Sequence, residues 1–446
     1  MGAKYRLFGS ETSPYSIKVR SYLRYKKLPF DWVAKGFGTE DEFQSLAKSQ
    51  ALPMLVSPKG GIAHDSSLIL SRIEGKVYKP SARPNDPACR VLALLLEEYA
   101  DEWLNKAMFH YRWGTPKAAK AAATRQADAI FEGYEVEDRA TIEKSIAKSM
   151  SGRLKLVGST KKTTPVIEGS FARFLKLLNA HLEKHLFLFG GHPSLADFAI
   201  AGQLIQLMKD DTSGAMMRDS APFVTAWCEF MEDPRQGAPF EDLSAVSETL
   251  LPLIRDEVLP TLIAWSEANT ESIAKKKKTV TVPMDVGEYK QGVQAHSATS
   301  YAALKAVFAG TPATPELEAF LKDAGLADIL PLGEPKAAEE KAAETTDDED
   351  GAPKADKPRS SRRRNRRSRS RSSDNQAASE GSEDSPAETS DASTPDEEAP
   401  AAEQPVDAPE TEESAPAAPA EDDAPAIAET ESAAEPEASE DEKKTE

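Results

Sequence analysis

The sequence predicts a small α/β unit, a larger all-helical unit, a short extension and a long disordered tail. Strand and helix patterns alternate over residues 1–80, whereas residues 89–268 show helical periodicity throughout. From about residue 334 the chain consists mostly of Ala, Pro, Glu, Asp, Ser and Thr and has no aromatic residue. We therefore predict an α/β domain at 1–80, a linker at 81–88, a helical domain at 89–268, an extension at 269–332 and a tail at 333–446.

The net charge of −19 on the 446 residues is concentrated near the C-terminal end. Residues 334–446 contain 14 basic and 34 acidic side chains, so this part carries −20 and the first 333 residues are nearly neutral. Such a composition cannot bury enough apolar surface to offset the entropy of ordering. We therefore predict that the tail is disordered.

The two cysteines, Cys89 and Cys228, lie in apolar helical patterns without metal-type spacing. They are expected to be buried free thiols, which suits a reducing compartment. We find no secretory pattern at the N-terminus, and no apolar run approaches the ~20 residues of a membrane span. These features indicate a cytoplasmic protein.

The first unit begins with a β-prone run, Tyr5–Phe8, that is followed by a polar loop and a helix. Pro14 suits the first turn of that helix, because an N–H at this position has no intrahelical partner. Ser13 would lie at the helix start, where backbone N–H groups and the helix dipole favour an anion such as a thiolate. The alternative is a simple helix cap. Further strands are predicted at Phe30–Val33, Leu52–Val56 and Ile62–Ala63, and helices at Glu40–Lys48 and Asp65–Ile73.

The second unit shows only helical patterns, which indicates an all-helical domain. Helices are predicted at Ala88–Tyr111, Lys117–Phe131, Asp138–Met150, Ile167–His185, Leu195–Lys209, Pro222–Met231 and Val246–Ala268. Pro252 and Pro260 should break or kink the last of them. In the extension we predict a hairpin from Thr279–Met284 and Glu288–Val293, and helices at Thr299–Phe308 and after Thr314.

Four short motifs resemble, in their order and spacing, the glutathione S-transferase superfamily, and the resemblance covers about residues 4–265. The run Ser13-Pro14-Tyr15-Ser16 is similar to the Ser/Cys-Pro-Tyr/Phe opening of many bacterial members. The run Ala51-Leu52-Pro53 resembles the strand start that holds a cis-proline. Asp65-Ser66 stands in the place of the acid–serine pair, and Pro193 to Phe198 resembles the buried capping box of the family.

The resemblance implies a thioredoxin-like N-terminal domain, an all-helical transferase-type C-terminal domain and glutathione as the ligand. It implies that Ser13 lowers the pKa of the glutathione thiol by a hydrogen bond. Leu52 and Pro53 would hold the peptide as an added strand would, and Asp65 and Ser66 would hold its γ-glutamyl end. Capping of the following helix is the alternative for the last two residues.

Several rival assignments stay open at this stage. No cysteine stands at the position of Ser13, so the resemblance to the cysteine-type members stops short. Ser10, Thr12 and Ser16 are rival hydroxyls if the loop register differs. Ser194 and Asp197 form a capping-box pattern, and we assign them a folding role rather than a catalytic one.

A pocket for the second substrate is expected between the two units. Tyr15, His110, Tyr111 and Trp113 are candidates to line it, with an interdomain core as the alternative for most of them. The second substrate would be a small hydrophobic electrophile. No metal is expected, and the resemblance implies a homodimer.

The first function hypothesis is therefore a serine-type glutathione transferase. The alternative is a non-catalytic transferase-like binding or scaffold protein whose charged tail recruits protein or RNA partners. The island at 357–371 contains eight arginines and one lysine and resembles segments that bind RNA phosphates. It has no aromatic residue for base stacking, and a self-neutralising tail is the alternative.

Overall fold

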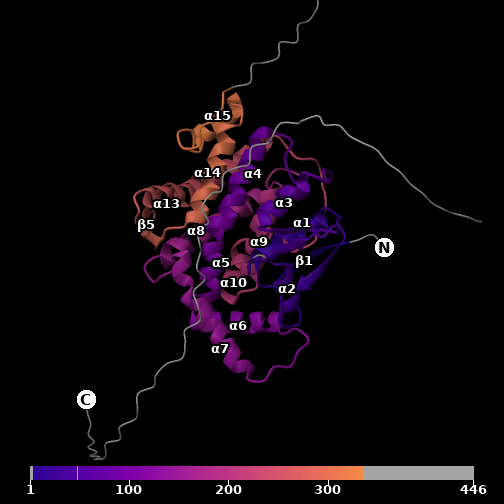
Figure 1. Cartoon of the computed structure of the whole chain (residues 1–446). Coiled ribbons are helices and arrows are strands. Elements are labelled where there is room, and N and C mark those ends of the chain that lie inside the picture. The colour runs from indigo at the N-terminus through magenta and orange to yellow at the C-terminus, as the bar shows by residue number, and fades with distance from the viewer. Residues whose placement is uncertain (1–3, 48, 335–446) are drawn as a thin grey trace, which may run out of the picture. The chain divides into compact units, whose positions relative to one another are not determined.

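The computed structural model describes residues 4–47 and 49–334 (Figure 1). The predicted tail, apart from Gly333 and Glu334, lies outside the described residues. The arginine-rich island at 357–371 lies outside them as well.

A four-stranded sheet forms the centre of the N-terminal domain. Its strand order is β2-β1-β3-β4, in which β2 is parallel to β1 and the other neighbours are antiparallel. The strands are β1 (Tyr5–Gly9), β2 (Phe30–Ala34), β3 (Met54–Val56) and β4 (Ile62–His64), and the helices are α1 (Pro14–Tyr25), α2 (Glu40–Leu46) and α3 (Ser66–Glu74). These elements confirm the predicted α/β unit.

The sheet is covered on both faces, because successive side chains of a strand point to opposite sides. Leu7 of β1 belongs to the main core together with α1 and α3. Phe8, the next residue, packs on the other face against Phe43 of α2 and Met54. The alternation along β1 thus explains why helices occupy both sides.

Helix α1 joins the N-terminal domain to the helical one. Ten of its 12 residues are buried, so it has almost no face toward water. Tyr22 meets Phe198 of helix α9 edge-on, with ring centroids 5.3 Å apart. The helix that begins after Ser13 is therefore held by both domains.

The second domain is helical throughout the part of the chain that the structure describes, which confirms the predicted architecture. Its helices are α4 (Pro87–Tyr99), α5 (Asn105–Trp113), α6 (Pro116–Ile130), α7 (Arg139–Gly152), α8 (Thr164–Leu182), α9 (Leu195–Met208), α10 (Asp211–Ser220), α11 (Pro222–Phe230), α12 (Leu243–Leu253) and α13 (Ala264–Ala274). Two π-helical segments, η2 (Ala100–Leu104) and η4 (Ile254–Ile263), join α4 to α5 and α12 to α13, and the 3-10 turn η3 (Leu154–Val157) follows α7.

The prolines near the end of this domain do not break the chain into separate helices. Pro252 lies inside α12 and Pro260 inside η4, and the helical path continues to Ala274. The local change is a π-helical segment, which alters the hydrogen-bond pattern without ending the helix. The chain is therefore not broken at these residues, and of the predicted break or kink only the break is wrong.

The capping box before α9 has the predicted form. The Asp197 carboxylate accepts hydrogen bonds from the backbone N–H of Ser194 (2.8 Å), from its hydroxyl (2.6 Å) and from the N–H of Leu188 (3.0 Å). Thirteen of the 14 residues of α9 are buried. A helix buried all round needs its first N–H groups paired within the protein, and this is what the box provides.

The extension consists of the hairpin β5 (Thr279–Met284) and β6 (Gly287–Gly292), followed by α14 (Ala295–Ala309) and α15 (Pro315–Asp323). The predicted hairpin is confirmed, and α14 begins four residues earlier than expected. Ser300 of α14 donates a hydrogen bond to Glu98 of α4 at 2.5 Å. The extension therefore packs on the helical domain. Both cysteines are buried free thiols, as predicted.

Candidate functional site

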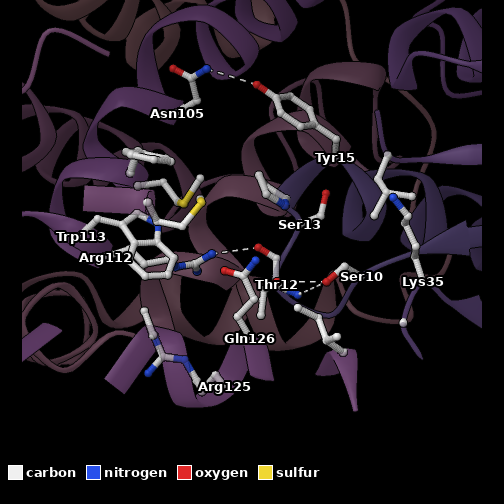
Figure 2. Close-up of a pocket in the computed structure, with 18 of the residues that line it drawn as sticks. Ser10, Thr12, Ser13, Tyr15, Lys35, Asn105, Arg112, Trp113, Arg125 and Gln126 are labelled. Atoms are coloured by element: carbon white, nitrogen blue, oxygen red, sulfur yellow. Dashed lines mark hydrogen bonds between the residues drawn. The ribbon is translucent and has the colours of Figure 1, made fainter. Parts of the chain in front are cut away.

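A pocket of about 660 Å³ lies between the N-terminal domain and the helical domain (Figure 2). The N-terminal domain contributes the loop before α1, the segment 35–40 and Leu52. The helical domain contributes α5, α6, Met150 and Val157. A cavity of this size matches the usual range for small-molecule sites.

Ser13 lies in the wall of this pocket and caps α1. Its Oγ accepts a hydrogen bond from the backbone N–H of Ser16 at 3.2 Å. No acceptor for its own hydroxyl hydrogen is found among the described residues. The cap assignment and the ligand assignment are thus compatible, since capping uses a lone pair and leaves the hydrogen free to donate.

The rival hydroxyls differ in their surroundings. Ser10 Oγ and Thr12 Oγ1 also line the pocket, but they are hydrogen-bonded to each other at 2.9 Å. The Ser16 hydroxyl is fully buried and is not part of the pocket wall. Of these four residues, Ser13 alone combines a pocket position with the helix start.

The helical domain holds the loop that precedes Ser13. Arg112 of α5 donates a hydrogen bond from Nη1 to the carbonyl oxygen of Thr12 at 2.8 Å, as Figure 2 shows. Gln206 of α9 donates to the carbonyl oxygen of Glu11 at 2.9 Å. Both side chains are buried, so these bonds fix the loop from behind.

Arg112 also contacts Asp210, which it shares with Arg125 of α6. The Arg112 Nε lies 3.2 Å from Asp210 Oδ2, and Arg125 forms an ion pair with Oδ1 of the same carboxylate. Burial lowers the pKa of Arg112 despite its partner, and the charge of Arg125 acts in the same direction. Two guanidinium groups therefore share one carboxylate beside the pocket.

The peptide bond between Leu52 and Pro53 is cis, as the resemblance implies. Leu52 lines the pocket and precedes β3. Its backbone N–H and C=O have no hydrogen-bond partner among the residues that the structure describes. An extended peptide in the pocket could use both groups as an added strand would.

Asp65 and Ser66 form the start of α3. Asp65 has φ of 72°, a conformation that non-glycine residues rarely adopt, and its carboxylate accepts from the N–H of Leu68 at 3.0 Å. Such backbone strain is concentrated at ligand sites in folded proteins. Neither residue is part of the wall of the 660 Å³ pocket. The capping contact is therefore present, and the ligand contact stays a prediction.

A buried lysine anchors the first turn of α3. Lys18 Nζ lies 2.9 Å from Ser67 Oγ, 2.8 Å from Glu97 Oε1 and 2.7 Å from Asp101 Oδ2. Burial opposes the charged ammonium, but the two carboxylates outweigh it and raise the pKa of Lys18. Burial raises the pKa of Asp101 to about 6, the charge of Lys18 opposes this shift, and the charge of Glu97 adds to it.

Tyr15 lines the pocket next to Ser13. Its hydroxyl donates to the Asp101 carbonyl oxygen at 3.0 Å and accepts from Asn105 Nδ2 at 3.1 Å (Figure 2). Burial raises the pKa of Tyr15 above its usual range. With its hydroxyl engaged on both sides, Tyr15 shapes the pocket rather than offering a free donor.

The three aromatic candidates on α5 lie in different places. Trp113 lines the pocket. His110 is buried, with Nδ1 2.8 Å from Ser159 Oγ, and Tyr111 packs against Phe171 at a centroid distance of 5.3 Å. His110 and Tyr111 therefore contribute to the interior of the helical domain instead of the pocket wall.

Among the described residues, no cluster of three or more His, Cys, Asp and Glu side chains could hold a metal ion. In residues 4–47 and 49–334, none of the helices is both long and apolar enough to cross a membrane.

Two family models match the chain. The model described as "Glutathione S-transferase, N-terminal domain" matches residues 7–81, and "Glutathione S-transferase, C-terminal domain" matches residues 121–230. Both matches support the resemblance of the chain to the glutathione S-transferase superfamily. A probable glutathione S-transferase of Oryza sativa subsp. japonica, GSTU6, is 25% identical over 199 residues, which are 43% of this chain and 80% of that protein.

Solved structures of other proteins also align with this chain. The β-etherase LigF from Sphingobium sp. strain SYK-6 is 17% identical, with 55% of this chain and 98% of that chain covered and a TM-score of 0.36. A glutathione S-transferase from Methylobacterium radiotolerans, in complex with glutathione sulfonate, is 23% identical, with 52% and 91% covered and a TM-score of 0.34.

The sequence did not indicate most of the apolar wall of this pocket. The missed residues are Met108, Ile130, Phe131, Met150 and Val157, whereas Phe109 belongs to the aromatic run 109–113 that the sequence indicated for the pocket. They come from α5 and from the long segment between α5 and α8. Their apolar character can be read from the sequence. No sequence pattern, however, shows that the end of α6 lies close to the loop before α1.

Contacts between α6 and segment 35–40 close one side of the pocket. Phe37 meets Phe131 with ring centroids 6.0 Å apart and Tyr134 at 5.2 Å. A Cβ placed on Gly36 would lie 2.4 Å from the carbonyl oxygen of Ile130, so only glycine allows this close approach.

Proposed function

We propose that this chain is a glutathione transferase of the serine type, in which Ser13 activates the glutathione thiol. The observation that carries the proposal is the Ser13 hydroxyl, which faces the pocket at the start of α1 with a hydrogen free to donate. A hydrogen bond donated to sulfur stabilises the thiolate over the thiol, and the helix N-terminus adds to this effect. The thiol pKa of bound glutathione is lowered as a result.

The peptide part of glutathione would extend from Ser13 along Leu52 toward the start of α3. The backbone groups of Leu52, which have no partner within residues 4–47 and 49–334, support this path, and Pro53 directly precedes β3. At α3, Asp65 and Ser66 would hold the γ-glutamyl end, where an ammonium suits the acid and a carboxylate suits the helix N-terminus.

The second substrate would be a hydrophobic electrophile bound against the apolar wall. Trp113, Phe109 and Phe131 lie in this wall, and Tyr15 forms part of the opposite side. The thiolate attacks the electrophilic carbon, a carbon–sulfur bond forms, and the leaving group departs with its electron pair. The step needs no metal ion.

The test is turnover of a panel of electrophiles with glutathione by the full-length protein and its variants. Ser13→Gly removes the hydroxyl while it costs the helix only a few tenths of a kcal/mol in capping. We expect kcat/KM to fall on the order of 100-fold, as when one donor to a developing anion is removed. Ser10→Ala is the matched control, and turnover unchanged in Ser13→Gly would remove Ser13 from this role.

Calorimetry with glutathione separates this function from the alternative, a non-catalytic binding or scaffold protein with a recruiting tail. Binding in the micromolar to millimolar range supports the transferase function. Absence of binding at millimolar glutathione would favour the scaffold function. RNA retention through the island at 357–371, lost steeply as salt rises, would then be the next measurement.

The proposal also includes the oligomeric state and the cellular compartment of the protein. The protein would be a homodimer, as the resemblance implies, and Leu68 and Tyr78 are large apolar side chains exposed on the N-terminal domain. It would act in the cytoplasm, where the buried thiols Cys89 and Cys228 stay reduced.

A further inference from the structure

We propose that the second substrate of this pocket is an amphipathic anion, with an apolar body and a carboxylate that Arg125 binds together with Gln126. The inference rests on the proposed function and names the substrate class of the same site. The wall of the pocket carries an excess of positive charge.

The imbalance comes from the carboxylate that Arg112 and Arg125 share. Asp210 is buried and contacts both guanidinium groups. The other hydrogen bonds of Arg112 go to uncharged oxygens, the carbonyl groups of Thr12 and Gln206 and the Gln206 amide. Two positive charges therefore face one negative charge, and one positive charge is left at the pocket.

The remaining charged groups of the pocket wall do not remove this surplus. Glu40 lies on the opposite side and is 3.7 Å from Lys35 Nζ, so these two charges offset each other. Lys209, which lies behind the loop, is offset by the nearby carboxylates of Glu11 and Glu232, so it leaves the surplus unchanged. The field at the pocket therefore favours an anion.

Arg125 is the cation that a ligand can reach. Its side chain is 31% exposed and lines the pocket, whereas the side chain of Arg112 is 5% exposed. Its Nη2 contacts Asp210, and no hydrogen bond from its other nitrogens is found in the described part of the chain. A guanidinium with free N–H groups matches a carboxylate in two-point geometry.

Gln126 adds a donor next to Arg125 on α6. Its amide has no hydrogen-bond partner among the described residues, although it lines the pocket. Figure 2 shows Arg125 and Gln126 on the side of the pocket formed by α6, with Ser13 on the side formed by α1. A ligand that spans the pocket would thus meet the thiol at one end and these donors at the other.

The body of the ligand is apolar because the wall between the two ends is apolar. Met108, Phe109 and Trp113 of α5 and Ile130 of α6 form this part of the wall. A neutral hydrophobic ligand fills the same space but leaves the charge of Arg125 to water. A carboxylate at the far end replaces that water with charge-assisted hydrogen bonds.

The experiment compares two glutathione conjugates of equal chain length on the full-length protein. One is S-hexylglutathione and the other is S-(5-carboxypentyl)glutathione, which differ only in the terminal group. Calorimetry at pH 7 and physiological salt should show the carboxylated conjugate binding roughly tenfold more tightly, as one hydrogen-bonded charged contact provides.

Variants of the protein show which residue causes the preference for the carboxylated conjugate. In Arg125→Gln the two conjugates should bind with about equal affinity. Arg125→Lys keeps the positive charge but loses the planar pair of N–H donors, so it should keep part of the preference for the carboxylated conjugate. Lys117→Gln is the matched control, because Lys117 lies on the same helix, is 87% exposed and pairs with Asp211 outside the pocket. The control should keep the full preference.

Each outcome decides a different point. Equal affinity of the wild type for both conjugates would overturn the inference and leave the proposed function standing. A preference that survives in Arg125→Gln would overturn the role of Arg125. Binding of neither conjugate would overturn the proposed function, and the inference would fall with it.

Discussion

At the scale of single residues, the position of Ser13 depends on side chains far away in the sequence. Arg112 and Gln206 hold the two carbonyl groups that precede it, from helices of the other domain. The sequence placed Ser13 correctly at a helix start, because Pro14 marks that start. No sequence pattern could indicate the contacts of Arg112, since its partners, on the loop before α1 and around the end of α9, are about 100 residues away in the sequence.

Replacing Arg112 should therefore affect both stability and catalysis. Arg112→Met leaves the Thr12 carbonyl without its buried partner, and we expect the free energy of unfolding to fall by ~3 kcal/mol. The value of kcat should fall more than glutathione affinity, because the hydroxyl is displaced while Leu52 and α3 remain. Chemical denaturation and steady-state kinetics measure the two effects.

Arg24→Met is the matched control for this change. Arg24 also donates to a main-chain oxygen, that of Glu232, but on the exposed side of α1. We expect less than ~1 kcal/mol of destabilisation and unchanged kinetics for it. Equal effects of the two variants would contradict the positioning role of Arg112.

His181 makes the fold sensitive to acid. It is fully buried in α8, stacks on His185 at 4.8 Å and hydrogen-bonds Thr249 at 2.8 Å. Burial, together with His185, lowers the pKa of His181 to about 4. Between pH 4 and the unfolded pKa of ~6.5 the unfolded chain binds the extra proton, so stability falls as pH falls through this window.

The free energy of unfolding should fall by ~1.4 kcal/mol for each pH unit between the two pKa values of His181. Denaturant unfolding at pH 7, 6 and 5 measures it, and His181→Gln should show a smaller slope. A slope that is the same in both proteins would assign the acid sensitivity to other groups.

At the scale of elements, apolar periodicity predicted most helices and strands because burial follows it. The helix α10 was missed, since Met217 is its only large buried side chain and no apolar stripe marks it. At Pro260, where a break or a kink was predicted, the chain continues as the π-helical segment η4. The part of the pocket wall that α6 contributes could not be predicted without the three-dimensional arrangement of the helices.

The contact between Gly36 and α6 yields a prediction at this scale. Gly36→Ala brings a Cβ against the Ile130 carbonyl oxygen, so segment 35–40 must shift away from α6. We expect the KM for the second substrate to rise by roughly threefold to tenfold, with little change for glutathione, since Leu52 and Ser13 lie outside this contact. Steady-state kinetics with each substrate varied in turn makes the distinction.

Gly152→Ala is the control for the added methyl group. Gly152 ends α7, and a Cβ there would meet no heavy atom within 4 Å. Its kinetics should match the wild type. A rise in the KM for glutathione in Gly36→Ala would show that the segment serves the peptide instead.

At the scale of the whole molecule, the domain order could be predicted because strand and helix patterns are segregated along the chain. The sequence indicated where the interdomain pocket lies, but it did not indicate the charge of the pocket wall. That charge comes from Arg112 and Arg125 sharing Asp210, three residues on separate helices. Their partnership exists only once α5, α6 and the start of α10 are packed together.

A further prediction for the whole molecule concerns its oligomeric state. The resemblance implies a homodimer, and sedimentation at micromolar concentration should give a mass near twice the 48.4 kDa of the chain. Replacing the exposed Tyr78 with Ser should weaken the dimer if this face forms the interface. A monomer at all concentrations would contradict the prediction.

The central claim is that Ser13 lowers the pKa of the glutathione thiol, and titration of the bound thiol tests it most directly. Ultraviolet absorbance of the thiolate is followed against pH for glutathione bound to the wild type and to Ser13→Gly. We predict a bound pKa at least one unit below that of free glutathione in the wild type and close to the free value in the variant. Equal pKa values in the two proteins would contradict the account.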